Sequence, residues 1–114
     1  MEEPATFYYK LAEQGNTEAQ HNLGVCYAKG FGVEVNPADA VKWWLKSAEQ
    51  GNAHAQFSLG YCYSWGLGVE KNDEQAKQWV FMALETARKK DMNAVELLAL
   101  ELIRKKGWAA GEAK

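Results

Sequence analysis

The chain has 114 residues with a formal net charge of −2 at pH 7, and 25% of its residues are charged. This balance argues against a nucleic-acid-binding protein, because contacting a phosphate backbone requires clustered lysine and arginine. No apolar stretch approaches the roughly 20 residues that a membrane-spanning helix needs. The hydrophobic share of 47% suits a globular core, so we expect one domain or a short repeat array.

The chain repeats itself at an interval of 36 residues. The segment AEQGN at 12–16 returns at 48–52, and the pair LG at 23–24 returns at 59–60. About half of the aligned positions agree without a gap, which is typical of repeat proteins. The match fades after Ala83, where an interval of 39 recovers only a weak echo. The sequence therefore predicts two full units flanked by atypical ends, as a solenoid requires.

Each full unit is predicted to contain two helices. Asn16 is expected to cap a first helix that ends at Gly30, and Asn36-Pro37 to begin a second helix that ends near Gly51. The second unit repeats these signals at Asn52, Gly66 and Asn72. We expect a single domain with four parts: a half repeat at 4–15, repeats at 16–51 and 52–87, and a capping helix and tail at 88–114.

One face of each first helix carries the repeated residues. At 100° per residue these positions fall on one arc, which predicts a packing interface shared by both units. The arc consists of Ala19, Gln20, Leu23, Gly24, Cys26 and Tyr27, and of their counterparts 36 residues later. Cys26 and Cys62 are the only cysteines, and we expect both to be reduced thiols that face the core of a cytoplasmic protein. The acidic start of the chain does not resemble a signal peptide.

The repeated motif Ala-x-x-x-Leu-Gly-x-x-Tyr-x-x-Gly-x-Gly-Val, followed by Ala-x-x-Trp and Ala-Glu-Gln-Gly, resembles the Sel1-like repeat family. The residues that carry the resemblance in the first unit are Ala19, Leu23, Gly24, Tyr27, Gly30, Gly32, Val33, Ala40, Trp43 and Ala48 to Gly51. The resemblance implies an all-α fold, an α/α solenoid of helix-turn-helix units with a degenerate C-terminal capping helix. It further implies that the first helices line a concave face and that the protein is an adaptor or scaffold.

The face opposite the packing arc is expected to bind a partner. In the second unit Phe57, Tyr61 and Trp65 lie at i, i+4 and i+8, which places an aromatic ladder along one helix. Exposed aromatics are common at binding hot spots, so we expect a groove for a peptide or protein. The alternative is that the superhelix or the C-terminal helix buries the ladder. The predicted partner-binding residues are His21, Val25, Lys29, His54, Phe57, Tyr61, Trp65, Glu96 and Leu100. At an interval of 39, Ile103 and Arg104 would extend this face, as Ser64 would in the second unit.

The tryptophans other than Trp65 are predicted to support the fold. Trp43 and Trp79 are expected in the core, and Trp44, with Tyr8 and Tyr9, between the second helices. Trp108 is expected to dock on the last helix.

The sequence offers little for catalysis. It contains no Ser-x-x-Lys and no Gly-x-Ser-x-Gly, so a nucleophile with a nearby base is not indicated. His21 and His54, with Glu18, form a weak alternative as a metal site, but their spacing matches no metal-binding motif. We expect no cofactor.

The two ends of the chain carry opposite charges. We expect these to be solvated charges, with the basic residues stabilising helix C-termini. The alternative is head-to-tail self-association between molecules. The acidic end contains Glu2, Glu3, Glu13 and Glu18; the basic end contains Arg88, Lys89, Lys90, Arg104, Lys105 and Lys106.

These observations favour a non-catalytic protein-interaction module. One version is a small inhibitor or immunity protein for a toxin or enzyme. Another class is a hydrolase resembling the Helicobacter cysteine-rich proteins, but each unit here has a single cysteine, so the disulfide within each unit of that branch cannot form. A third interpretation is an excerpt from a longer array.

Overall fold

Asparagine caps begin four of the helices, as the sequence predicts. In each case the asparagine side-chain oxygen accepts a hydrogen bond from the backbone N–H three residues later. Gly30 and Gly66 end the first helix of each unit in the left-handed conformation. The computed structural model describes residues 4–108, which form helices α1 (Pro4–Glu13), α2 (Thr17–Lys29), α3 (Pro37–Glu49), α4 (Ala53–Trp65), α5 (Asp73–Lys89) and α6 (Asn93–Lys106).

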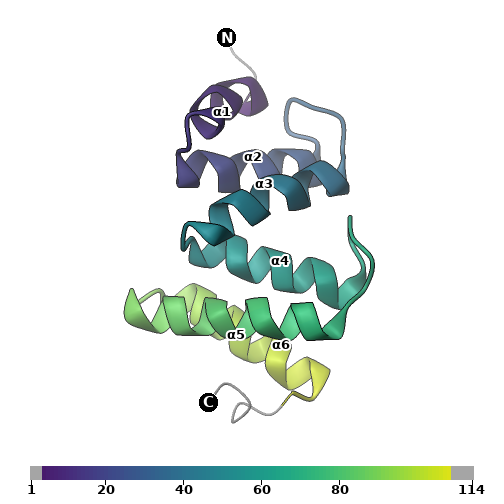
Figure 1. Ribbon diagram of the computed structural model, residues 1–114, viewed down its shortest axis with the longest axis vertical. Coiled ribbons are helices and arrows are strands. Elements are labelled where there is room, and N and C mark those ends of the chain that lie inside the picture. Colours follow the sequence, from purple (N-terminus) through teal and green to yellow (C-terminus); the bar gives the residue numbers. More distant parts are fainter. Residues whose placement is uncertain (1–3, 109–114) are drawn as a thin grey trace.

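The helices stack in chain order into an all-α solenoid, which confirms the predicted fold class. Figure 1 shows the stack running along the longest axis from α1 at one end to α5 and α6 at the other. The described residues extend over 47 × 29 × 19 Å. The α2–α3 and α4–α5 connections lie on the same side of the stack, so equivalent parts of the two units face the same way (Figure 1).

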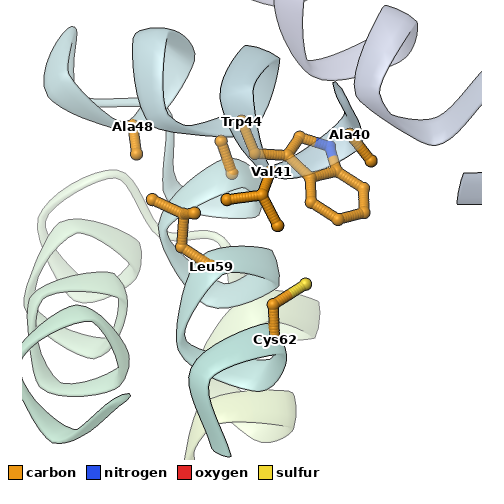
Figure 2. Close-up of a cluster of buried hydrophobic side chains, with 7 residues drawn as sticks. Ala40, Val41, Trp44, Ala48, Leu59 and Cys62 are labelled. Carbon is orange, nitrogen blue, oxygen red and sulfur yellow. The ribbon is translucent and has the colours of Figure 1, made fainter. Parts of the chain in front are cut away.

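The two helices of a unit meet closely where the first helix has a glycine. A Cβ atom on Gly24 would overlap the indole ring of Trp44, and a Cβ atom on Gly60 would overlap the Val80 side chain. This close approach lets the Trp44 Nε1–H donate a hydrogen bond of 3.1 Å to the backbone oxygen of His21. Figure 2 shows the core that results on the other side of α3, where Trp44 and its neighbours face Leu59 and Cys62 of α4.

Buried glutamines tie each first helix to the helix before it. The Gln20 Nε2 donates to the Ala12 oxygen at 3.1 Å, and the Gln56 Nε2 donates to the Ala48 oxygen at 3.2 Å. Each bond spans eight residues and gives a second donor to a carbonyl near a helix C-terminus, which also accepts from the backbone N–H of Gly15 or Gly51. The repeated glutamines therefore hold successive helix pairs in the same relative position.

The third unit lies one residue away from the predicted register, because its interval is 40 and not 39. The α5 helix has 17 residues and α3 has 13, so α5 contains about one extra turn. After this turn Asp91, with a φ of 54°, occupies the place of Gly51. Glu96 occupies the place of Gln56, and its carboxylate accepts a hydrogen bond from the Arg88 side chain, eight residues earlier. Four residues rotate a helix by about 400°, so the extra turn leaves the buried face nearly unchanged.

The tryptophans support the fold in different ways. Trp43 and Trp44 are buried, as is Trp108, which packs in a cluster with residues of α5 and α6. Trp79 is only half-buried, and Tyr9 is exposed with its ring edge-on to Trp43. The predicted core role therefore holds for Trp43 but not for Trp79, which only packs against the edge of the α3–α4 cluster. The prediction that Trp44 lies between the second helices is wrong, because its ring packs between the first helices α2 and α4.

The glycine contact generates a stability prediction. Replacing Gly60 by alanine improves helix propensity by about 1 kcal/mol, but the new methyl overlaps Val80 and lies 3.1 Å from its backbone nitrogen. Because backbone cannot move as a side-chain end can, we expect a net loss of about 1–3 kcal/mol in the free energy of unfolding.

Urea denaturation followed by circular dichroism measures this loss. Gly51→Ala serves as a comparison for backbone strain alone, since Gly51 has a positive φ and no neighbouring atom within 4 Å, whereas Gly60 lies in a helix without such a φ. A Gly60→Ala variant as stable as the wild type would contradict close packing at this point.

Candidate functional site

A pocket of about 460 Å³ opens between α2 and α4, where residues opposite the shared packing arc meet Cys62 at the edge of the arc. Helix α3 closes it from behind, because its first half passes between the two first helices. The walls are predominantly apolar. The lining residues are Ala28, Lys29, Pro37, Ala40, Trp44, Phe57, Ser58, Tyr61, Cys62 and Leu67.

Local side-chain size explains why space remains here. The Trp44 ring lies against Gly24 on α2, with Ala40 and Cys62 next to it in the same core cluster (Figure 2). Among the lining residues of α2 and α4, Ala28 and Ser58 have small side chains. The pocket is therefore walled by aromatic rings and left open by small residues between them.

The aromatic ladder forms along α4, and its three rings differ in exposure. The ring centroids are 6.1 Å apart for Phe57 and Tyr61 and 6.3 Å apart for Tyr61 and Trp65. Tyr61 and Trp65 are 44% and 43% exposed, whereas Phe57 is half-buried against residues of α5 and α6. The predicted exposed ladder and the alternative of a ladder buried by the C-terminal helix are each correct in part. The C-terminal helices cover Phe57 and leave Tyr61 open.

Trp65 is open to solvent on one side only. The Lys106 Nζ lies 4.6 Å from its ring centroid, in the geometry of a cation–π contact. The same ammonium group is 3.5 Å from an Asp73 carboxylate oxygen and donates to the Ser64 carbonyl at 3.3 Å. Lys106 is therefore held against the end of the ladder and is not available as a free cation.

Of the other predicted residues of α2 and α4, Lys29 lines the pocket, whereas His21, Val25 and His54 are not among its lining residues. Lys29 and His54 are exposed, and His21 and Val25 are half-buried. The rings of His21 and His54 lie 5.4 Å apart between centroids. Burial lowers the pKa of His21, and the nearby His54 lowers it further, so the His21 imidazole is neutral at pH 7.

Four residues expected on this face have other places. Ser64 and Ile103 are buried, Glu96 bonds Arg88, and Leu100 is half-buried against the α5–α6 cluster. The reason for the last three is the register of 40, which puts Glu96 at the position of Gln56 and Leu100 at that of Gly60. The positions of Phe57 and Tyr61 are instead occupied by Leu97 and Glu101, both exposed.

The face predicted from the sequence accounts for the α2 and α4 side of the pocket only. The missed walls are Pro37, Ala40 and Trp44 from α3 and Leu67 from the α4–α5 connection. A helical face predicted for the first helices contains no information about which second-helix residues reach between them. Of the two small residues on the wall, Ala28 lies on the face predicted for α2, three residues after Val25, whereas no sequence signal distinguishes Ser58.

Residues 4–108 contain no group of three or more His, Cys, Asp or Glu side chains arranged to hold a metal ion. His21 and His54 are thus neighbours without a third ligand in the described part of the chain. In the same part, no helix is long and apolar enough to cross a membrane.

The basic end is largely occupied by local contacts. Arg88 pairs with Glu96, Lys89 with Glu85 and Arg104 with Glu101, while Lys90 donates to the Gly51 carbonyl. These pairings leave less charge for attraction between molecules. Of the acidic residues, Glu2 and Glu3 lie outside the described residues.

Both cysteines are free thiols buried in the core, as predicted. Burial raises the pKa of Cys26, and it raises the pKa of Cys62 to about 11. Since only the thiolate attacks disulfide reagents, we expect Cys62 in the folded protein to react at pH 8 about a hundredfold more slowly than an ordinary thiol.

The reaction rate of the thiols is measured by absorbance with an aromatic disulfide reagent, once in buffer and once in denaturant. Two thiols per chain should react at once in denaturant and neither should in buffer. Immediate reaction of the folded chain would mean that the pocket exposes the Cys62 sulfur.

Comparison with known proteins identifies the repeat and two solved structures similar to this chain. The model of the Sel1 repeat matches residues 17–52 and 53–85. A comparison with curated proteins found no match. Among solved structures, a Sel1 repeat protein from Oxalobacter formigenes is 35% identical over 69% of this chain and 60% of its own, with a TM-score of 0.68.

A second solved structure covers nearly the whole chain. It is a protective antigen of uropathogenic Escherichia coli strains that displays an SLR fold, 34% identical over 96% of this chain with a TM-score of 0.68. This chain spans only 26% of that protein and 60% of the Oxalobacter protein. The repeated motif, the helix pairs and these matches agree, and the chain belongs to the Sel1 repeat family.

Proposed function

We propose that this chain is a non-catalytic interaction module that binds a peptide or protein partner in the concave pocket between α2 and α4. The observation that carries the proposal is the pocket of about 460 Å³, whose rim includes Tyr61 at 44% exposure. Sites of this volume, walled by apolar and aromatic side chains, are typical of ligand recognition. Sel1 repeats typically mediate protein–protein interactions, which supports the same function.

Leaving the exposed aromatic rings of the pocket rim in water is unfavourable compared with burying them against a partner. Tyr61 and Trp65 present large rings with few rotatable bonds, so burying them against a partner removes much apolar area from water at a small entropic cost. The neutral His21 and half-buried Val25 extend the surface along α2. We therefore assign partner binding to His21, Val25, Lys29, His54, Phe57, Tyr61 and Trp65.

An inhibitor or immunity protein is a narrower version of this function, in which the partner is a toxin or an enzyme. Hydrolysis, as in the Helicobacter branch, is the alternative of another class, and turnover of a chromogenic β-lactam by the pure protein would favour it. We place the protein in the cytoplasm, because its two buried cysteines are unpaired and 36 residues apart.

The pocket rim provides the test. We expect Tyr61→Ala to weaken partner binding at least tenfold, because truncating a central aromatic commonly removes 2 kcal/mol or more. Its partly exposed ring makes few core contacts, so the melting temperature should change little. Affinity capture from native lysate followed by titration calorimetry with the purified partner measures the effect.

Met82→Ala is the matched control, since Met82 is 45% exposed on α5, and Met82 is not among the residues of the pocket wall. Equal affinity of the Tyr61→Ala variant and the wild type would move the interface away from the pocket. A large drop in melting temperature would instead show that Tyr61 is a core residue.

A further inference from the structure

We propose that the pocket recognises a peptide in which a large apolar side chain stands next to a carboxylate, with the apolar side chain inside the pocket and the carboxylate at Lys29. This inference rests on the proposed function, because it assumes that the pocket is the partner site. It adds the chemistry of the partner, which neither the family nor the matched structures specify.

The interior of the pocket selects an apolar group. Trp44, Phe57 and Leu67 are large apolar side chains on the wall, and the indole N–H of Trp44 is already bonded to the His21 carbonyl. The hydroxyls of Ser58 and Tyr61 are the other side-chain hydrogen-bonding groups on the wall besides the Lys29 ammonium. A polar side chain entering here would lose water without gaining enough partners, whereas an apolar one gains from burial.

The mouth of the pocket selects a negative charge. Lys29 is the only charged residue on the wall, it is exposed, and no ion pair joins it to any residue of 4–108. No carboxylate lines the pocket. Pro37, at the first turn of α3, forms part of the same wall, but the positive end of that helix is already capped by the Asn36 side chain and faces the carboxylate of Asp39. Lys29 is therefore the group that supplies positive charge at the wall.

A lysine in the last turn of α2 also stabilises that helix, because it faces the negative end of the helix dipole. Helix stability is therefore a competing reason for a cation at this position. The two roles differ in what they predict. A helix-stabilising lysine affects the melting temperature alone, whereas a recognition lysine changes which peptides bind.

One unpaired cation favours a peptide over an extended polyanion. A nucleic acid or an anionic membrane requires several basic groups on one surface. Here the neighbouring cation Lys106 is held by Asp73 and by the ring of Trp65. The rings of Tyr61 and Trp65 continue from the pocket along α4, which gives the chain of a peptide an apolar surface beyond its anchor.

Selection from a displayed library of random twelve-residue peptides tests this proposal with the full chain. The wild type should enrich peptides with Phe, Trp, Leu or Met within two residues of Asp or Glu. For synthetic versions, replacing Asp by Asn should weaken binding about two- to fivefold, the strength of one exposed ion pair, and 0.5 M salt should reduce that difference.

Charge reversal at the pocket gives the discriminating result. Lys29→Glu should reverse the preference, enriching Lys or Arg beside the apolar residue and binding the Asn peptide better than the Asp peptide. Lys42→Glu is the matched control, because Lys42 is an exposed lysine of α3 that does not line the pocket. It should keep the wild-type preference, and circular dichroism should show both variants folded.

A third variant separates failure of this inference from failure of the proposed function. Ala28→Phe fills the pocket and should abolish enrichment. Suppose the pocket-filled variant loses binding, but Asp and Asn peptides bind equally or Lys29→Glu leaves the preference unchanged. Recognition of a carboxylate by Lys29 is then wrong, while peptide binding in the pocket is supported. If the wild type enriches no peptide beyond the pocket-filled variant, both the proposed function and this inference are wrong.

Discussion

The close approach of the two helices of each unit at Gly24 and Gly60 is the constraint on which the rest of the structure depends. Any side chain there would overlap Trp44 or Val80, so only glycine permits this helix separation. With the helices this close, the far side of the second helix reaches the next first helix, where Ala40 and Val41 of α3 pack against Leu59 of α4 (Figure 2). Repetition of this contact builds the solenoid, because each unit buries its apolar face only against its neighbours.

The candidate site arises where the two units differ at this contact. In the first unit the partner of the glycine is Trp44, whose ring lies against α2 and also forms part of the pocket wall. In the second unit the partner is Val80, which stays in a core cluster with Ala99 and Trp108. The helix framework is therefore shared by the units, and the pocket arises where residues within it differ, Trp44 in place of a valine among them.

The C-terminal end shows how the array changes when the repeat pattern is relaxed. The longer α5 moves Glu96 to the glutamine position, where an exposed ion pair with Arg88 replaces a buried hydrogen bond to a carbonyl. The last residues of α6 then bring Lys106 to the ring of Trp65. Closure of the array thus limits the surface that the aromatic ladder presents, and it leaves Tyr61 and the pocket open.

Local signals determined most of the fold from the sequence alone: asparagine caps, glycines with positive φ and the repeated face of each first helix all act within a few residues of each other. The register of the third unit was not predictable, because the extra turn lies inside α5, where four added residues preserve the helical pattern. The pocket was predictable only from its α2 and α4 side. Its other walls come from α3 and the α4–α5 connection, and the exposure of Trp65 depends on Lys106 in α6. Only the tertiary structure decided these features, because burial is a property of surfaces that meet after folding and not of one helix.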